Sequence, residues 1–122
     1  MNSFSINIAS CFSDYLRPNL EALAEALVII PTYNEKENVE SMIRKVFSLP
    51  AEFDLLIVDD GSPDGTGDIV KTLMTEFPNR LFIEERQGKL GLGTAYIHGF
   101  KWGLKRAYEF FFEMDCDFSH TP

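Results

Sequence analysis

From residue 27 onward the chain alternates short, largely apolar runs with stretches whose apolar residues recur at helical spacing. The apolar runs are followed by turn residues such as proline, glycine and aspartate, which is typical of strands buried within a sheet. The predicted strands cover residues 27–30, 55–58, 81–85 and 109–114. Strands that alternate with helices indicate βαβ crossovers. The pattern therefore predicts an α/β fold with a mostly parallel sheet and helices on both of its faces.

The first two predicted helices have clear apolar stripes. Asn34 is positioned to cap the first helix, with Glu37 three residues later, a spacing typical of a capping box. The apolar positions of this helix fall within 39–47, and those of the second helix fall within 69–77. Both stripes have the width expected of helices that pack on one side against a sheet.

A third helix is predicted over residues 94–108. Its predicted apolar face consists of Ile97, Phe100, Leu104 and Tyr108. Gly99 and Gly103 are expected to loosen this helix, because glycine is a poor helix former. Trp102 falls off the apolar stripe, and we expect it to be only partly packed.

Composition and charge limit the class of protein. Residues 1–26 carry no strong motif beyond a possible short helix at 19–26, so we treat them as an extension of unknown role before one domain at 27–122. An apolar fraction of 45% and a charged fraction of 25% exclude a disordered chain. A net charge of -8 argues against nucleic acid as a partner. An acidic protein still binds phosphates when a divalent cation lies between the two.

Two further features bear on location and redox state. No run approaches the roughly 20 apolar residues of a membrane helix, and the N-terminus lacks the pattern of a secretory signal. We therefore expect the chain itself to stay in the cytosol. Cys11 and Cys116 lie far apart in a sequence without an export signal, so no structural disulfide is expected.

Polar and acidic residues follow three of the four predicted strands, at 32–35, 59–62 and 115–117. In an open parallel sheet, ligands bind outside the carboxyl ends of the strands, where the strand order switches. Acidic groups brought together at that edge repel one another unless a cation or hydrogen-bond donors share the site. The interpretation that we favour is a ligand site that contains a divalent metal ion.

Asp115 and Asp117 are the candidate metal ligands. Residues two apart in an extended chain point to the same side, so their oxygens can reach one ion. Hard oxygen ligands favour Mg²⁺ or Mn²⁺ over zinc. The alternative is that the two aspartates only end a strand in a turn, but matching acids at two other strand ends favour the metal. Asp59 and Asp60 also exceed what a turn needs, and one of them is a candidate acceptor for base or ribose donors.

Gly88, Gly91 and Gly93 form a G-x-x-G-x-G pattern after the third predicted strand. This is not the G-x-G-x-x-G pattern of dinucleotide-binding enzymes, and the chain also lacks a P-loop, so both of these classes are disfavoured. The glycines either let the loop approach a phosphate or sugar, with Arg86 and Lys89 close by, or form a flexible connection. The sequence does not decide between the two.

Four segments in this order resemble the family 2 glycosyltransferases of GT-A (Rossmann-like) fold: ALVIIPTYNEKENV, LLIVDDGSPDGT, GKLGLGTAYIHGFKWGL and FFEMDCDFSHTP. Within that family the similarity is to dolichyl-phosphate and polyprenyl-phosphate mannosyltransferases, and it runs from about Ala26 to Pro122. The motifs are moderately specific singly and highly specific in this order. The family usually has alanine where this chain has Cys116, a small change that leaves the metal role intact.

The resemblance implies roles for particular residues. The residues implied to line the nucleotide-sugar site are Pro31, Tyr33, Glu35, Val58, Asp60, Asp115, Cys116 and Asp117. Among them, Val58 and Asp60 are expected to contact the base or ribose. Asp115 and Asp117 form the DxD-type element, and are expected to hold Mg²⁺ or Mn²⁺ and the diphosphate as the catalytic residues.

The activity implied by the resemblance is a metal-dependent, inverting transfer of mannose from GDP-mannose to a dolichyl or polyprenyl phosphate. It also implies a peripheral protein at the cytoplasmic face of a membrane. Members of the family continue well past the DxD strand with segments that bind the acceptor, and we expect the fold here to be truncated after that strand. Two alternatives stay open: a catalytically inert nucleotide-binding fragment without the acceptor half, and a transferase that uses another nucleotide sugar such as UDP-glucose.

Overall fold

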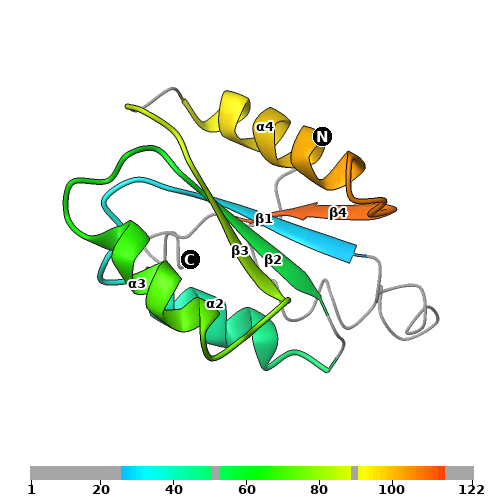
Figure 1. Cartoon of the computed structure of the whole chain (residues 1–122), viewed down its shortest axis with the longest axis horizontal. Helices are drawn as coiled ribbons and strands as arrows, with labels where there is room; N and C mark the ends of the chain where they lie inside the picture. The colour runs from blue at the N-terminus through cyan, green and yellow to red at the C-terminus, as the bar shows by residue number, and fades with distance from the viewer. Residues whose placement is uncertain (1–25, 51–52, 89–90, 115–122) are drawn as a thin grey trace, which may run out of the picture.

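A computed structural model describes residues 26–50, 53–88 and 91–114 of the chain (Figure 1). Within these ranges strands and helices alternate along the chain. The strands are β1 (Ala26–Thr32), β2 (Asp54–Asp59), β3 (Leu81–Glu85) and β4 (Phe110–Glu113). The helices are α2 (Val39–Phe47), α3 (Thr66–Met74) and α4 (Leu92–Leu104).

The strands form one sheet in the order β3-β2-β1-β4, and every neighbouring pair is parallel. β1 and β2 lie in the middle, which explains why both are continuous apolar runs rather than alternating ones. Residues 26–30 of β1 are fully buried. The predicted α/β fold with a mostly parallel sheet is therefore confirmed.

Helices cover both faces of the sheet (Figure 1). Val28 and Ile30 of β1 pack in the cluster that contains the buried residues of α2 and α3. Leu27 and Ile29, which alternate with them, pack in the cluster on the α4 side. From β1 the chain steps outward through β2 to β3, and then returns through α4 to place β4 on the other side of β1. This reversal makes the carboxyl ends of β1 and β4 the switch point of the sheet.

The first helix begins later than the capping pattern predicts. α2 starts at Val39 with Asn38 at its N-cap position. Asn34 instead has a left-handed backbone with φ of 56°, and its N–H donates to Ser62 Oγ at 2.9 Å. The prediction for Asn34 was wrong because this residue is needed to bend the loop after β1, and a turn beginning at Glu35 precedes the helix.

The buried face of α4 also differs from the predicted one. Ile97 and Leu104, predicted to face the core, are about half exposed, and Trp102, predicted to be only partly packed, is buried. Gly99 and Gly103 do not loosen the helix but allow it to lie close to the sheet. A Cβ atom on Gly99 would lie 2.7 Å from Ile29 Cγ2, and one on Gly103 would lie 2.5 Å from the Phe111 ring.

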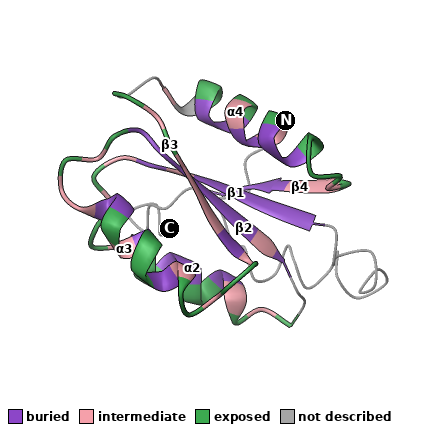
Figure 2. Cartoon of the chain, in the orientation of Figure 1, coloured by how far each residue is buried: buried purple, intermediate pink, exposed green. Residues whose placement is uncertain are grey.

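The reason for this error is that the small residues mark the side of α4 that contacts β1. Ala95, Tyr96, Gly99, Trp102 and Gly103 are all buried and recur at the spacing of one helical face. A search for large apolar residues overlooks a face of this kind. Figure 2 shows α4 with buried positions toward the sheet and exposed positions on its outer side.

Ala26 belongs to β1, so the strand begins one residue earlier than predicted; the rest of the predicted helix at 19–26 lies outside the described residues. No helix in the described part of the chain is long and apolar enough to cross a membrane.

Candidate functional site

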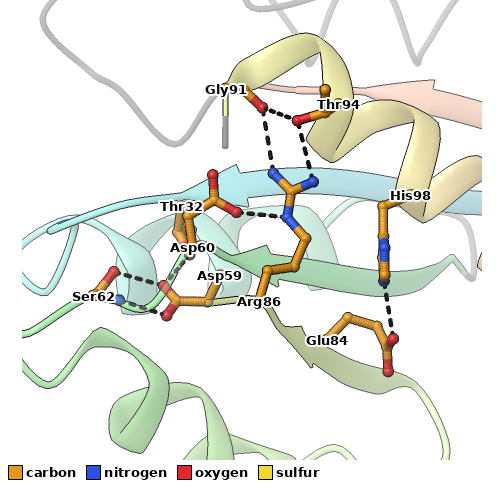
Figure 3. Close-up of polar contacts among 9 residues, drawn as sticks. All are labelled: Thr32, Asp59, Asp60, Ser62, Glu84, Arg86, Gly91, Thr94 and His98. Atoms are coloured by element: carbon orange, nitrogen blue, oxygen red, sulfur yellow. Dashed lines mark hydrogen bonds and ion pairs between the residues drawn. The ribbon is translucent and has the colours of Figure 1, made fainter. Parts of the chain in front are cut away.

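Polar side chains gather at the carboxyl edge of the sheet, where β1 and β2 end and the loop after β3 begins (Figure 3). Thr32 pairs in register with Asp59, and Asp59 pairs with Glu85, so the three strand ends lie level with one another. Thr32, Asp59 and Asp60 are all buried. The edge is therefore a set of enclosed polar groups rather than a solvated surface.

The carboxylate of Asp59 accepts three hydrogen bonds from neighbouring residues. It is 1% exposed and accepts hydrogen bonds from Thr32 Oγ1 at 2.7 Å and from Ser62 Oγ at 2.6 Å. The backbone N–H of Ser62 donates to it at 3.0 Å. Asp59 thus fixes the turn after β2 and joins it to the end of β1, which is a structural role.

Asp60 forms an ion pair with Arg86, the first residue after β3 (Figure 3). Arg86 Nε lies 2.7 Å from Asp60 Oδ1, and the two side chains are only 8% and 7% exposed. Backbone hydrogen bonds hold both ends: Asp60 N–H donates to Thr32 O, and Arg86 N–H donates to Asp59 O. A charge pair this enclosed depends on both partners, since either charge alone would be buried without compensation.

The same arginine connects the sheet edge to the start of α4. Arg86 Nη1 donates to Thr94 Oγ1 at 3.2 Å and Arg86 Nη2 donates to Gly91 O at 3.3 Å. The glycine-containing loop is therefore tied to the sheet at both of its described ends, and Lys89 lies outside the described residues. Arg86 is directed toward Asp60 and α4, whereas the sequence left open whether it approaches a phosphate.

The loop after β1 is fastened to the loop after β2 by backbone donors. Glu35 N–H donates to Thr66 Oγ1 at 3.0 Å, and Lys36 N–H donates to Asp64 Oδ2 at 3.2 Å. Burial alone would raise the pKa of Asp64, but hydrogen bonds from Thr66 and Lys36 outweigh that effect and hold the pKa below its ordinary value. These contacts order the segment 33–36, which leads from β1 into α2, against the neighbouring loop.

The predicted nucleotide residues fall into two groups. Pro31, Tyr33 and Glu35 are partly exposed and lie at the end of β1 or just beyond it. Val58 is fully buried in the cluster on the α4 side, so its side chain is packed in the core. The roles assigned to these residues and to Asp60 stay predictions.

The DxD-type residues Asp115, Cys116 and Asp117 lie outside the described residues. The residue before them is well anchored: Met114 N–H donates to Ile29 O at 3.0 Å, and Tyr96 Oη donates to Met114 O at 3.2 Å. The described chain therefore ends at the switch point beside β1, and Asp115 is the next residue in the sequence.

The two carboxylates at the end of β2 do not need a metal ion to be accommodated. We expected the acids at three strand ends to repel one another unless a cation or hydrogen-bond donors share the site, with a metal ion as the favoured solution. At the end of β2 the structure shows protein partners instead: Thr32 and Ser62 donate hydrogen bonds to Asp59, and Arg86 pairs with Asp60. Within the described ranges no group of three His, Cys, Asp or Glu side chains is suited to hold a metal. The candidate metal ligands of this chain are therefore Asp115 and Asp117, which lie outside the described residues.

Another carboxylate at this edge, that of Glu84, contacts a histidine of α4. His98 Nε2 is 3.0 Å from Glu84 Oε1, which joins α4 to β3 (Figure 3). Both side chains are more than one third exposed. This contact stabilises the position of α4 little, because solvent screens exposed pairs of this kind.

Comparison with known proteins identifies the family. Residues 27–122 match the sequence profile of Glycosyl transferase family 2, which covers most of the chain. The chain belongs to this family. Among curated proteins, a polyprenol monophosphomannose synthase of Mycolicibacterium smegmatis is 49% identical over 96 residues, or 79% of this chain and 36% of that protein. An undecaprenyl-phosphate mannosyltransferase of Micrococcus luteus is also 49% identical over 96 residues, or 39% of its length.

Solved structures show that the family 2 chain has the GT-A fold. The mannosyltransferase PcManGT of Pyrobaculum calidifontis, solved with GDP-Man and Mn²⁺, has a TM-score of 0.60 at 23% identity and covers 64% of this chain and 24% of its own. TarS of S. aureus has a TM-score of 0.59 at 26% identity over 75% of this chain and 27% of its own. The chain therefore spans less than two fifths of the length of these curated relatives and solved structures.

Proposed function

We propose that this chain is the donor-nucleotide part of a glycosyltransferase that moves mannose from GDP-mannose to a polyprenyl or dolichyl phosphate. The observation that carries the proposal is its 49% identity to two proteins whose names state mannose transfer to a polyprenyl carrier. The match includes the acidic strand ends of β2 and β4. Since the chain covers 36% and 39% of those proteins, the acceptor and the complete reaction belong to the proposal.

The nucleotide is proposed to lie across the carboxyl edge of the sheet, as expected for an open parallel sheet. Asp60 is the candidate acceptor for donors of the base or ribose, as the family resemblance implies, whereas Asp59 already accepts three hydrogen bonds from the protein. Pro31, Tyr33 and Glu35 would line the pocket from the β1 side. Val58 would contribute through its main chain, since its side chain is buried in the core.

The nature of the donor is the finer part of the proposal. The GT-A fold accommodates different nucleotides, since PcManGT was solved with GDP-Man and TarS with UDP-GlcNAc. We favour GDP-mannose because both curated relatives are named for mannose or mannosyl transfer. UDP-glucose or another nucleotide sugar is the alternative that a binding experiment decides.

Asp115 and Asp117 are the residues proposed to hold Mg²⁺ or Mn²⁺ with the diphosphate. Their donor set fits a hard divalent ion, because two carboxylates offer only oxygen ligands. Met114, the residue before this pair in the sequence, also supports the assignment. It is hydrogen-bonded to Ile29 of β1 and to Tyr96 of α4, at the switch point of the sheet. A bound divalent ion would neutralise the charge that develops on the leaving diphosphate.

The remaining residues of the site bind and orient rather than transfer protons. The acceptor phosphate is already anionic, so it can attack the sugar carbon in line without a strong general base. Arg86 holds Asp60 and the start of α4 in one arrangement, which keeps the nucleotide-facing edge fixed during that displacement. A single displacement inverts the configuration at the sugar carbon.

We also propose that the protein acts as a peripheral protein at the cytoplasmic face of a membrane. A lipid-linked phosphate is held at a bilayer surface, so the catalytic edge must be brought close to that surface. This location follows from the proposed acceptor.

The experiment that tests the proposed function is isothermal titration of the chain with GDP, UDP and their sugars, with and without Mn²⁺. GDP should bind more tightly than UDP, and Mn²⁺ should strengthen binding. Asp117→Ala should remove the metal-dependent part, and Asp60→Ala should weaken GDP and GDP-mannose equally. Asp68→Ala is the matched control, because Asp68 is an exposed aspartate on α3. Equal affinity for UDP and GDP, or metal-independent binding, would contradict the assignment.

A transfer assay separates the enzyme from the inert-fragment alternative. Radiolabelled GDP-mannose and a polyprenyl phosphate are incubated with the chain, and lipid-linked mannose is extracted and counted. Product from the chain supports the enzyme. Tight metal-dependent GDP binding without any product supports a nucleotide-binding part that needs an acceptor half.

A further inference from the structure

The outer face of α4 carries apolar and basic side chains together. We define this face by Ile97, Lys101, Leu104 and Lys105, all of which are exposed. Ile97 and Leu104 are the large apolar side chains that are most exposed in the described chain, at 53% and 52%. They lie seven residues apart, or about two helical turns, so they project to the same side with Lys101 between them.

The outer face of α4 does not take part in packing the helix on the sheet. Its opposite side already contacts the core through Ala95, Tyr96 and Trp102, and through the close approach of Gly99 and Gly103 to β1 and β4. A helix with apolar residues on both sides is typically covered on both sides. The outer face of α4 therefore has the composition of a contact surface.

The stretch of sequence that forms α4 is basic, whereas the whole protein is acidic. The chain has 19 acidic and 11 basic residues, yet no acidic residue occurs between Arg86 and Glu109. Lys101, Lys105 and Arg106 all lie in this stretch, at the end of α4 or just after it. The surface thus concentrates positive charge on a protein with a net charge of -8.

Two of these three cations, Lys101 and Lys105, take no part in the ion pairs of the described fold. Arg106 stacks its guanidinium 3.8 Å from the centre of the Trp102 ring and donates to Trp102 O, which holds its charge at the same end of the helix. The positive charge is therefore available to an external partner.

We propose that the outer face of α4 rests on an anionic lipid surface. Ile97 and Leu104 would enter the boundary between head groups and acyl chains, and Lys101 and Lys105 would extend toward lipid phosphates, as in other interfacial helices. A symmetric contact with a second copy is disfavoured, because it would bring the same lysines against one another. Nucleic acid is disfavoured because two large apolar side chains, Ile97 and Leu104, are exposed on the same face beside the lysines.

This inference deepens the proposed function and rests on it for the lipid-linked acceptor. Arg86 ties the N-terminal end of α4 to the carboxyl edge of the sheet through Gly91 and Thr94. A helix fixed to the membrane on its outer face would therefore also fix the distance between that edge and the lipid. The contact would keep the proposed nucleotide site beside the membrane.

The test is co-sedimentation of the full chain with vesicles, in the absence of nucleotide and metal. The chain should bind vesicles of phosphatidylcholine mixed equally with phosphatidylglycerol, and should not bind phosphatidylcholine alone. Lys101→Glu should weaken this binding at least about fivefold, because each basic residue near an anionic surface contributes about that factor. Lys45→Glu, the same charge change on an exposed site of α2, should leave it unchanged. Ile97→Gln with Leu104→Gln should weaken binding even at salt concentrations that screen the lysines.

The proposal is overturned if Lys101→Glu and Lys45→Glu weaken vesicle binding equally, or if neutral and anionic vesicles bind alike. It is also overturned if the chain ignores vesicles but forms a dimer in analytical ultracentrifugation that the Ile97 and Leu104 substitutions dissociate. All substituted side chains are exposed, and far-UV circular dichroism checks that the variants fold. Vesicle binding without nucleotide binding would refute the proposed function but not the membrane contact of α4. Nucleotide binding without vesicle binding would refute the membrane contact but not the proposed function.

Discussion

Replacement of Arg86 by methionine tests whether the buried ion pair holds the carboxyl edge of the sheet together. Methionine keeps much of the length of the side chain but removes its charge and its donors. Asp60, 7% exposed and 2.7 Å from Arg86 Nε, then stays buried without its charge partner. The contacts of the guanidinium with Gly91 and Thr94 are lost at the same time.

The expected cost follows from the enclosure of the pair. Removal of one partner from a buried ion pair costs about 3–5 kcal/mol, a large part of the roughly 5–15 kcal/mol by which domains are stable. Asp60→Asn combined with Arg86→Met should be less destabilising than the sum of the two single changes, because no lone charge is then left in the interior. The chain contains a matched control in Arg44 and Glu76, an arginine–carboxylate pair whose side chains are 45% and 49% exposed.

Urea unfolding followed by circular dichroism measures these differences. Arg86→Met should lower the midpoint strongly, whereas Arg44→Met should leave it nearly unchanged, because solvent already screens that pair. GDP titration of Arg86→Met in the folded range should also show weaker binding, since the proposed acceptor Asp60 loses its fixed position. The reasoning is refuted if the two arginine variants lose the same stability, or if the Asp60 and Arg86 changes are simply additive.

Three further predictions concern packing and pH. Gly103→Ala should destabilise the fold by about 1–3 kcal/mol, because the new Cβ would lie 2.5 Å from the Phe111 ring. Gly93→Ala places its Cβ in open space within α4 and should stabilise the fold by up to about 1 kcal/mol. Thermal unfolding midpoints that shift in the same direction for both variants would contradict this. The pKa of Asp64 is lower in the folded protein than its ordinary value of 3.8. The carboxylate therefore contributes its full stabilisation above pH 3.8, and this stabilisation is lost as pH falls through the lower folded pKa. The difference in urea midpoint between the wild type and Asp64→Asn should therefore disappear in strong acid. Burial and a hydrogen bond to Asp54 of β2 raise the pKa of Tyr108 above its ordinary value of 10.0. The free energy of unfolding of the wild type should therefore fall as pH rises above 10.0, and Tyr108→Phe should lack this contribution. Identical alkaline stability profiles of the two proteins would exclude the effect.

The alternation of strands and helices could be predicted from the sequence because buried parallel strands are continuous apolar runs. The orientation of α4 could not, since its buried side is formed largely by small residues. Gly99 and Gly103 look like helix weakeners in isolation, and only their closeness to Ile29 and Phe111 reveals that side chains would not fit there. Ile97 was therefore assigned to the wrong side of the helix.

The candidate site was predictable in position but not in detail. Acidic residues at the strand ends were expected to gather at the carboxyl edge of the sheet, and Asp59 and Asp60 do lie there beside Thr32 of β1, because parallel strands bring their carboxyl ends together. The pattern of residues alone did not distinguish Asp59 from Asp60, since the two stand side by side at the end of β2, and only the family resemblance singled out Asp60. The structure gives them different partners: hydroxyl and backbone donors surround Asp59, and Arg86, which is distant in sequence, pairs with Asp60.

The place of β4 beside β1 has a consequence for the order in which the protein is made. Ala26 of β1 pairs with Phe110 of β4, so the central strand leaves the ribosome long before one of its two neighbours exists. Contacts between such distant segments form slowly, because a long loop must first be closed. Among the four described strands, the pairing at the switch point is thus the last to be completed during synthesis, and until then one edge of β1 is a surface that chaperones or other nascent chains can reach.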